Sequence, residues 1–170
     1  MEERKMMTNF RNIPGVPHKG WSLDTVYDIR DDGQTEEETN YEACMMCGNE
    51  KIRYVHVLSH PEYSQQMKVG CNCAEKMTDD YINPTRYERN LRNKSARRQN
   101  WLKTNWKFSR QGDYYLKRDG HILIIFIDKR SGLYQGKIDN TFGRKKYKTV
   151  DLVKVALFNG IEYLKSKGQW

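Results

Sequence analysis

The sequence of 170 residues contains no long hydrophobic run. Its longest apolar stretch, Ile122 to Ile127, has the length of a β-strand, whereas a membrane-spanning helix needs about 20 apolar residues. The opening segment, MEERKMMTNF, is charged and lacks the apolar centre of a signal peptide. We therefore expect a cytoplasmic protein with no membrane partner, in a reducing compartment where cysteine pairs are more often metal ligands than disulfides.

Motifs of common enzyme chemistries are also missing. The sequence has no glycine-rich phosphate loop, no Gly-x-Ser-x-Gly elbow and no His-Glu-x-x-His pair. Only 37% of the residues are hydrophobic, so the chain cannot build one large core, and a metal would help a small module to fold. These absences predict a protein that is not an enzyme and has no small-molecule substrate.

The four cysteines lie together in one short stretch, between Tyr41 and Asp80. They form two close pairs, and this spacing predicts one structural Zn²⁺ site with four thiolate ligands: Cys44, Cys47, Cys71 and Cys73. Gly48 would let the chain turn back after the second ligand. Two alternatives remain open: His56 or His60 replaces one cysteine, or the four cysteines are buried hydrophobic residues or two disulfides.

The segment between the pairs predicts a hairpin. Residues 52–58 alternate as a strand, residues 61–66 form a turn, residues 67–69 resume an extended path, and a helix opens at the second cysteine pair. Cysteine turn, hairpin and helix in this order resemble a treble-clef zinc finger. That resemblance implies a structural zinc site.

Treble-clef scaffolds also carry the His-Asn-His nucleases, in which a histidine of the hairpin activates water beside a second metal. His56 has the corresponding place, but Val55 precedes it where that family has aspartate, and the downstream Asn and His are missing. We interpret His56 as a core residue and His60-Pro61 as a turn. A metal-dependent nuclease is kept as a third hypothesis.

Charge is divided unequally along the chain. Residues 1–83 carry 9 Lys/Arg against 15 Asp/Glu, net −6, whereas residues 84–170 carry 21 against 7, net +14. Such asymmetry is typical of proteins that bind nucleic acid or another polyanion. The acidic run at residues 31–38 is expected to be solvated or disordered, or to compete with nucleic acid for the basic half.

The basic half opens with a predicted helix. Asn83-Pro84 is a typical helix start, and no proline or glycine follows until after Phe108. Eleven basic residues against two acidic ones fall between residues 84 and 118, and such a row can follow phosphates. Trp101 and Trp106 are interpreted as core residues, with stacking on bases as the alternative.

The last third predicts a three-stranded meander and a helix. The strands are residues 113–118, 121–127 and 133–138, with Asp119-Gly120 as a two-residue turn, and Thr149 caps the final helix. This β-β-β-α order resembles the DNA-binding domain of plant ethylene-response factors and the N-terminal arms of integrases. The resemblance implies that the sheet enters the major groove, with contacts from Arg118, Lys129, Arg130, Lys137 and Arg144. With the preceding helix included, the order also resembles a double-stranded-RNA-binding domain.

We therefore predict an α+β protein with four segments: an irregular arm at 1–40 with a short ordered piece near residues 21–29, a zinc finger at 41–83, a basic connector helix at 84–110, and a β-β-β-α domain at 111–170. The expected partner is nucleic acid, with DNA favoured over RNA. The alternative is a phage- or plasmid-type regulator whose basic face binds an acidic or nucleic-acid-binding protein. Predicted nucleic-acid contacts are Arg86, Arg89, Arg92, Lys94, Arg97, Arg98, Lys103, Arg118, Lys129, Arg130, Lys137, Arg144, Lys145 and Lys146.

Overall fold

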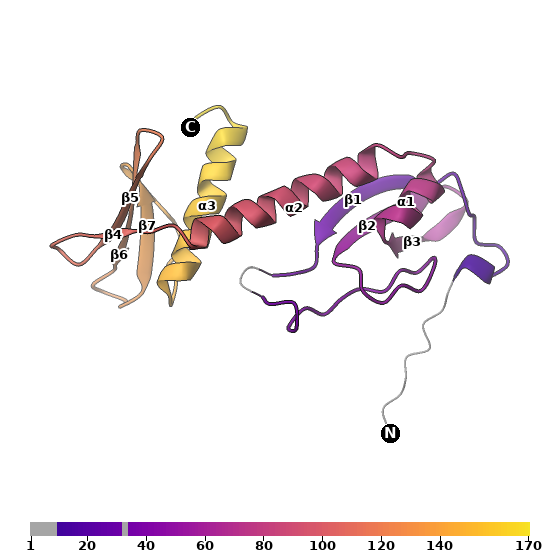
Figure 1. Ribbon diagram of the computed structural model, residues 1–170, viewed down its shortest axis with the longest axis horizontal. Coiled ribbons are helices and arrows are strands. Elements are labelled where there is room, and N and C mark those ends of the chain that lie inside the picture. The colour runs from indigo at the N-terminus through magenta and orange to yellow at the C-terminus, as the bar shows by residue number, and fades with distance from the viewer. Residues whose placement is uncertain (1–9, 32–33) are drawn as a thin grey trace, which may run out of the picture. The chain divides into compact units, whose positions relative to one another are not determined.

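A computed structural model of the protein describes residues 10–31 and 34–170. Within these residues it shows three α-helices and two antiparallel sheets, of three and five strands, which confirms the predicted α+β class (Figure 1). The chain forms two compact units, one ending at Lys94 and the other beginning at Ser95, and α2 (Asn83–Leu102) runs across this boundary. No helix in the described part of the chain is both long and apolar enough to cross a bilayer. The opening charged segment and part of the acidic run, residues 32 and 33, lie outside the described residues.

The first unit is built on a three-stranded sheet. Its strands are β1 (Ser22–Asp28), β2 (Tyr54–His60) and β3 (Tyr63–Val69), in the order β1-β2-β3, followed by α1 (Cys71–Thr78). The ordered piece predicted near residues 21–29 is thus a strand of the sheet, and a short helix, Phe10–Asn12, precedes it. The central strand β2 is buried from Tyr54 to Leu58 because it lies between the other two strands and belongs to the core of this unit.

The turn of the predicted hairpin is shorter than expected. His60 pairs with Tyr63, so Pro61 and Glu62 alone connect the strands, and the predicted turn over residues 61–66 is wrong. The Glu62 backbone N–H donates to His60 Nδ1 at 3.1 Å. This contact confirms the interpretation of His60-Pro61 as a turn.

The second unit is a five-stranded meander with one helix. The strands, in spatial and chain order, are β4 (Lys107–Phe108), β5 (Tyr114–Arg118), β6 (His121–Ile127), β7 (Tyr134–Ile138) and β8 (Thr141–Phe142), and the helix is α3 (Val150–Ser166). The three predicted strands are confirmed, and β4 and β8 extend the sheet at its edges. Asp119 and Gly120 both have positive φ, as their two-residue turn requires. Thr149 Oγ1 accepts the Leu152 N–H at 3.3 Å, which confirms the predicted cap of α3.

The connector helix ends earlier than predicted. α2 stops at Leu102, and Lys107–Phe108 is a strand rather than helix. Trp101 and Trp106 are both buried, with ring centroids 5.7 Å apart, and Trp101 Nε1 donates to the Lys154 carbonyl at 2.7 Å. Residues five apart lie about 140° apart around an α-helix, so a continued helix could not turn both rings into one core. The core interpretation of the two tryptophans is confirmed, and neither ring is available to stack on bases.

Candidate metal centre and nucleic-acid interface

The first cysteine pair lies on a tight turn before β2. The Cys44 N–H donates to the Asn49 carbonyl at 2.7 Å, and the Gly48 N–H donates to the Cys44 carbonyl at 2.8 Å. Gly48 has a φ of 76°, in the left-handed region that glycine enters without strain. The turn is closed by an isolated bridge between Glu42 and Ile52. The expected role of Gly48 is confirmed.

Three of the four cysteines meet at one point. The sulfur atoms of Cys44, Cys47 and Cys73 lie within 4.8 Å of one another. Thiolates around a tetrahedral Zn²⁺ are about 3.8 Å apart, given Zn–S bonds of about 2.3 Å. The sulfurs therefore need to approach by at most about 1 Å to hold the ion, and the donor set is one that zinc favours.

The fourth cysteine does not belong to this group. Cys71 and Cys73 are two residues apart on α1, and such residues point about 200° apart around a helix. The Cys71 sulfur instead lies within 4.8 Å of ligand atoms of His56 and Glu88. The predicted four-thiolate site is thus divided in the structure between two groups.

Electrostatics differ between the two groups. Contact with the Cys73 thiol lowers the pKa of Cys44 well below the usual thiol range, and the same contact raises the pKa of Cys73. Burial raises the pKa of Cys71, a hydrogen bond with Thr85 opposes that change, and the charge of Glu88 adds to it. The Cys44 thiolate therefore forms readily, whereas the raised pKa of Cys73 means that its thiolate needs a nearby cation.

A polar hollow of about 530 Å³ lies beside the cysteines. All four cysteines and Glu88 line it, and its arginine side chains are Arg30, Arg53 and Arg92. Arg53 makes a bidentate ion pair with Asp28, at 2.9 and 2.8 Å. This bidentate pairing fixes the orientation of the Arg53 guanidinium beside the hollow.

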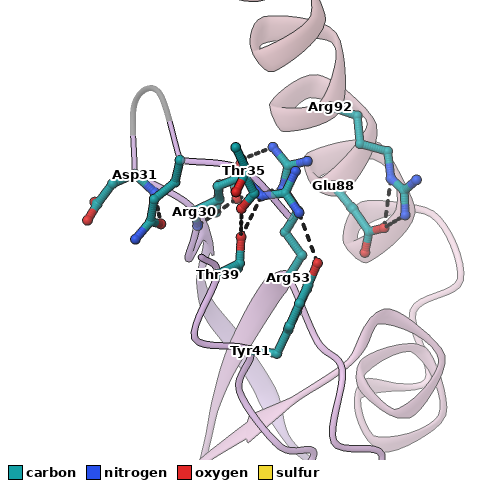
Figure 2. A network of polar contacts seen from close by, with 10 residues as sticks. Arg30, Asp31, Thr35, Thr39, Tyr41, Arg53, Glu88 and Arg92 are labelled. Carbon is teal, nitrogen blue, oxygen red and sulfur yellow. Dashed lines mark hydrogen bonds and ion pairs between the residues drawn. The ribbon is translucent and has the colours of Figure 1, made fainter. Parts of the chain in front are cut away.

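Hydrogen bonds from Arg30 and Arg92 hold the rim of this hollow. Arg30 donates to Thr39 Oγ1 at 2.8 Å and to Tyr41 OH at 2.9 Å, and on α2 Arg92 donates twice to Glu88 Oε1, at 3.0 and 2.6 Å (Figure 2). The Thr39 hydroxyl in turn donates to the Thr35 carbonyl at 2.6 Å. The described end of the acidic run therefore forms a hydrogen-bonded turn, and residues 35–38 are exposed, as expected of a solvated segment.

The basic residues predicted to bind nucleic acid are distributed over both units. Arg86, Arg89, Arg92 and Lys94 belong to the first unit and the others to the second. Several already have partners: Arg86 donates to Asn83 Oδ1, Arg97 pairs with Glu162 at 2.7 Å, and Lys146 pairs with Asp128 at 2.8 Å. Among the described residues, a further set makes no ion pair: Arg89, Lys94, Lys103, Lys129, Arg130, Lys137, Arg144 and Lys145.

The two faces of the five-stranded sheet differ. A Cβ at Gly136 would lie 2.8 Å from Val153 Cγ1 and 3.0 Å from Leu157 Cδ2, so Gly136 faces α3. Because side chains alternate along a strand, Gln135 and Lys137 point to the opposite face. The register places Lys107, Tyr115, Ile124, Lys137 and Phe142 directly opposite one another across all five strands, on that open face.

Other side chains extend this row. Lys117 pairs with Ile122, and Phe126 contacts the Phe142 ring edge-to-face at 5.8 Å. Lys137 Nζ lies 5.4 Å from the centroid of the Phe142 ring. Arg118, by contrast, alternates to the α3 side, where its guanidinium lies 5.3 Å from the Trp101 ring. Lys137 thus lies on the open face beside lysines and aromatic rings that the sequence analysis did not select. Arg118 lies on the other face of the sheet.

The two histidines of β2 differ in burial, and His60 is partly exposed at the end of the strand. His56 is fully buried on β2, with Nε2 3.3 Å from the Pro84 carbonyl oxygen, and its Nδ1 has no hydrogen-bond partner among the described residues. The sequence analysis did not single out Glu88, because its place within a basic helix gave no signal of a role beside a cysteine.

In comparisons with protein-family models, with curated proteins and with solved structures, nothing matches this chain.

Proposed function

We propose that the chain is a non-enzymatic, zinc-stabilised nucleic-acid-binding protein, which binds exposed bases on the open face of its five-stranded sheet. The observation that carries this proposal is the row Lys107, Tyr115, Ile124, Lys137 and Phe142, which crosses all five strands. Two lysines set among aromatic and apolar side chains supply the two contacts that single strands require: cations for phosphates and flat surfaces for bases.

The open face suits exposed bases better than a duplex. Its centre is apolar, with Ile122, Ile124 and Phe126 on β6, and Phe142 is 57% exposed beside it. A duplex presents its charged backbone to a protein surface, whereas bases of a single strand can cover isoleucine and phenylalanine. The proposed ligand is therefore single-stranded, with DNA favoured over RNA.

Zinc has a structural role in this proposal. The thiolates of Cys44, Cys47 and Cys73 would hold the ion and join the turn before β2 to helix α1, in the manner of a treble clef. These ligands converge only when the first unit is folded, so metal binding would stabilise that unit. The Cys44 side chain is buried, which limits exchange of the ion.

The test is equilibrium binding by fluorescence anisotropy. Zinc-loaded protein is titrated into labelled 20-nucleotide single strands of DNA and RNA and into a duplex of the same sequence, at several salt concentrations. We expect tighter binding to single strands, with log affinity falling by about 0.7 per contacted phosphate for each unit of log salt. Equal or tighter binding to the duplex would contradict base contacts, and no binding at low salt would contradict the proposed function.

One observation favours a second candidate, a protein partner. Ile122 and Phe142 are exposed apolar side chains on the same open face, and apolar groups of this size often mark a protein interface. In that case the lysines would recognise an acidic rim on the partner. This candidate requires that the chain binds no nucleic acid in the titration above.

A further inference from the structure

Three elements of the first unit bring a second set of metal-binding side chains together. His56 comes from β2, Cys71 is the first residue of α1, and Glu88 lies in the first half of α2. Their ligand atoms lie within 4.8 Å of one another. Nitrogen, thiolate and carboxylate ligands around one tetrahedral ion are about 3.3 to 3.6 Å apart, so a small closing movement brings them to a metal.

The state of His56 points to a missing ligand. Its side chain is fully buried, and Nδ1 has no hydrogen-bond partner among the described residues. A buried polar atom without a partner is rare in native proteins. Its other nitrogen, Nε2, lies 3.3 Å from the Pro84 carbonyl oxygen and can donate its hydrogen there. Metal-binding histidines typically donate one N–H to a carbonyl in this way, which leaves the lone pair of the other nitrogen for the ion.

The other two side chains are also held in place. Both hydrogen bonds from Arg92 reach Glu88 Oε1. The Cys71 sulfur lies 3.6 Å from Thr85 Oγ1, and that hydroxyl donates to Glu75 Oε1. Metal ligands in proteins are typically oriented by hydrogen bonds from neighbouring groups. Arg92 holds the Glu88 carboxylate in this way, and the Thr85 hydroxyl holds the Cys71 thiol.

We propose that His56, Cys71 and Glu88 form a second metal site, which binds Zn²⁺ with three protein ligands and one exchangeable position. Imidazole, thiolate and carboxylate are all zinc ligands, and three of them leave one tetrahedral position open. Cys71 and Glu88 line the hollow of about 530 Å³, so water or an anion can reach the ion from there. Arg30, Arg53 and Arg92 on the same hollow favour an anionic fourth ligand.

Metal stoichiometry tests this site. The full-length protein is loaded with zinc, freed of excess ion by gel filtration and analysed for zinc per chain by mass spectrometry. We expect two ions in the unaltered chain and one in Glu88→Gln. Glu62→Gln is the control, because Glu62 is an exposed carboxylate on the turn between β2 and β3 and belongs to neither group of ligands, and it should keep two ions.

Cobalt substitution gives a second readout that does not depend on counting. Cys71→Ser should lower the thiolate-to-cobalt absorbance in proportion to a change from four metal-bound thiolates to three, with an unchanged circular dichroism spectrum. One ion in the unaltered chain, lost altogether in Cys71→Ser, would show that Cys71 completes a single four-thiolate site and would overturn the proposal. Two ions retained in Glu88→Gln would overturn it as well. Binding of nucleic acid by the sheet is measured with other variants in the other unit, so each proposal can fail alone.

Discussion

Gly136 and Val153 approach so closely that a Cβ on the glycine would lie 2.8 Å from Val153 Cγ1. This contact lets α3 lie directly on β7, and it fixes which face of the sheet is covered. The lysines and aromatic rings on the other side of β7 are open as a consequence. Gly136 therefore marks the face of the sheet that packs on α3, and the buried Leu123 and Ile125 of β6 lie on the same face.

Gly136→Ala should destabilise the second unit. The added methyl group meets Val153 and Leu157 at 2.8 to 3.1 Å, and overpacking of this kind costs about 1–3 kcal/mol. Gly160→Ala is the control, because its Cβ would meet only Ile138 Cδ1 at 3.6 Å and alanine favours a helix by roughly 0.5–1 kcal/mol. Thermal unfolding followed by circular dichroism checks both changes, and a Gly136→Ala protein as stable as the unaltered chain would contradict the close packing.

Removal of zinc should loosen the first unit alone. Without the ion, nothing joins Cys44 and Cys47 of the turn to Cys73 of α1, and the turn and the helix then lose their connection. Hydrogen exchange read by mass spectrometry should become at least about tenfold faster between residues 44 and 78 after chelation. Peptides from residues 114–161 serve as the internal control, and equal loosening there would contradict an independent second unit.

The second unit should lose stability in acid as the Asp128 carboxylate becomes protonated. An ion pair with Lys146 and hydrogen bonds from Ser131 lower the pKa of Asp128 to about 2. Because the folded pKa is below the ordinary value, the carboxylate stabilises the fold above about pH 4, and this contribution disappears as the pH falls through about 2. Asp128→Asn should melt a few degrees lower than the unaltered chain at pH 7, and the two should converge near pH 2. A difference that persists at pH 2 would assign the effect to another cause.

Phe142→Ala should weaken single-strand binding without changing its salt dependence. A base stacked on an aromatic ring contributes about 1–3 kcal/mol, so the expected loss is roughly 5- to 150-fold in affinity. Phe108→Ala is the matched control: Phe108 is 64% exposed but pairs with Tyr114 on the α3 side of the sheet. Anisotropy titrations compare the two variants. An equal loss of affinity in both would contradict binding of the single strand to the open face.

Local signals in the sequence predicted most of the second unit. Asp119-Gly120 and the Thr149 cap act over a few residues, so the strands and α3 follow from them. The end of α2 carried no such signal, because burial of Trp106 against Trp101 stops the helix there. Packing of both tryptophans into the core of the second unit decided this boundary, and helix propensity did not.

The candidate sites were predicted only in part for similar reasons. The spacing of the cysteines correctly indicated that Cys44, Cys47 and Cys73 meet. The helical geometry of Cys71 and Cys73, which separates their side chains, could have been read from the sequence once a helix was placed there. Glu88 meets His56 and Cys71 only through tertiary packing, and no local pattern contains that information.

The open sheet face is tested most directly by two charge-matched triple variants, each compared with the unaltered chain in single-strand titrations across a salt series. Lys107, Lys117 and Lys137 are changed to Gln in one, and three exposed lysines at or beyond the ends of α3, Lys148, Lys165 and Lys167, are changed to Gln in the other. Both lose three positive charges. We expect the first variant to lose at least about tenfold in affinity and about 2 units of salt slope, and the second to change little. Equal losses in the two variants would show that net charge, and not the open face, binds the nucleic acid.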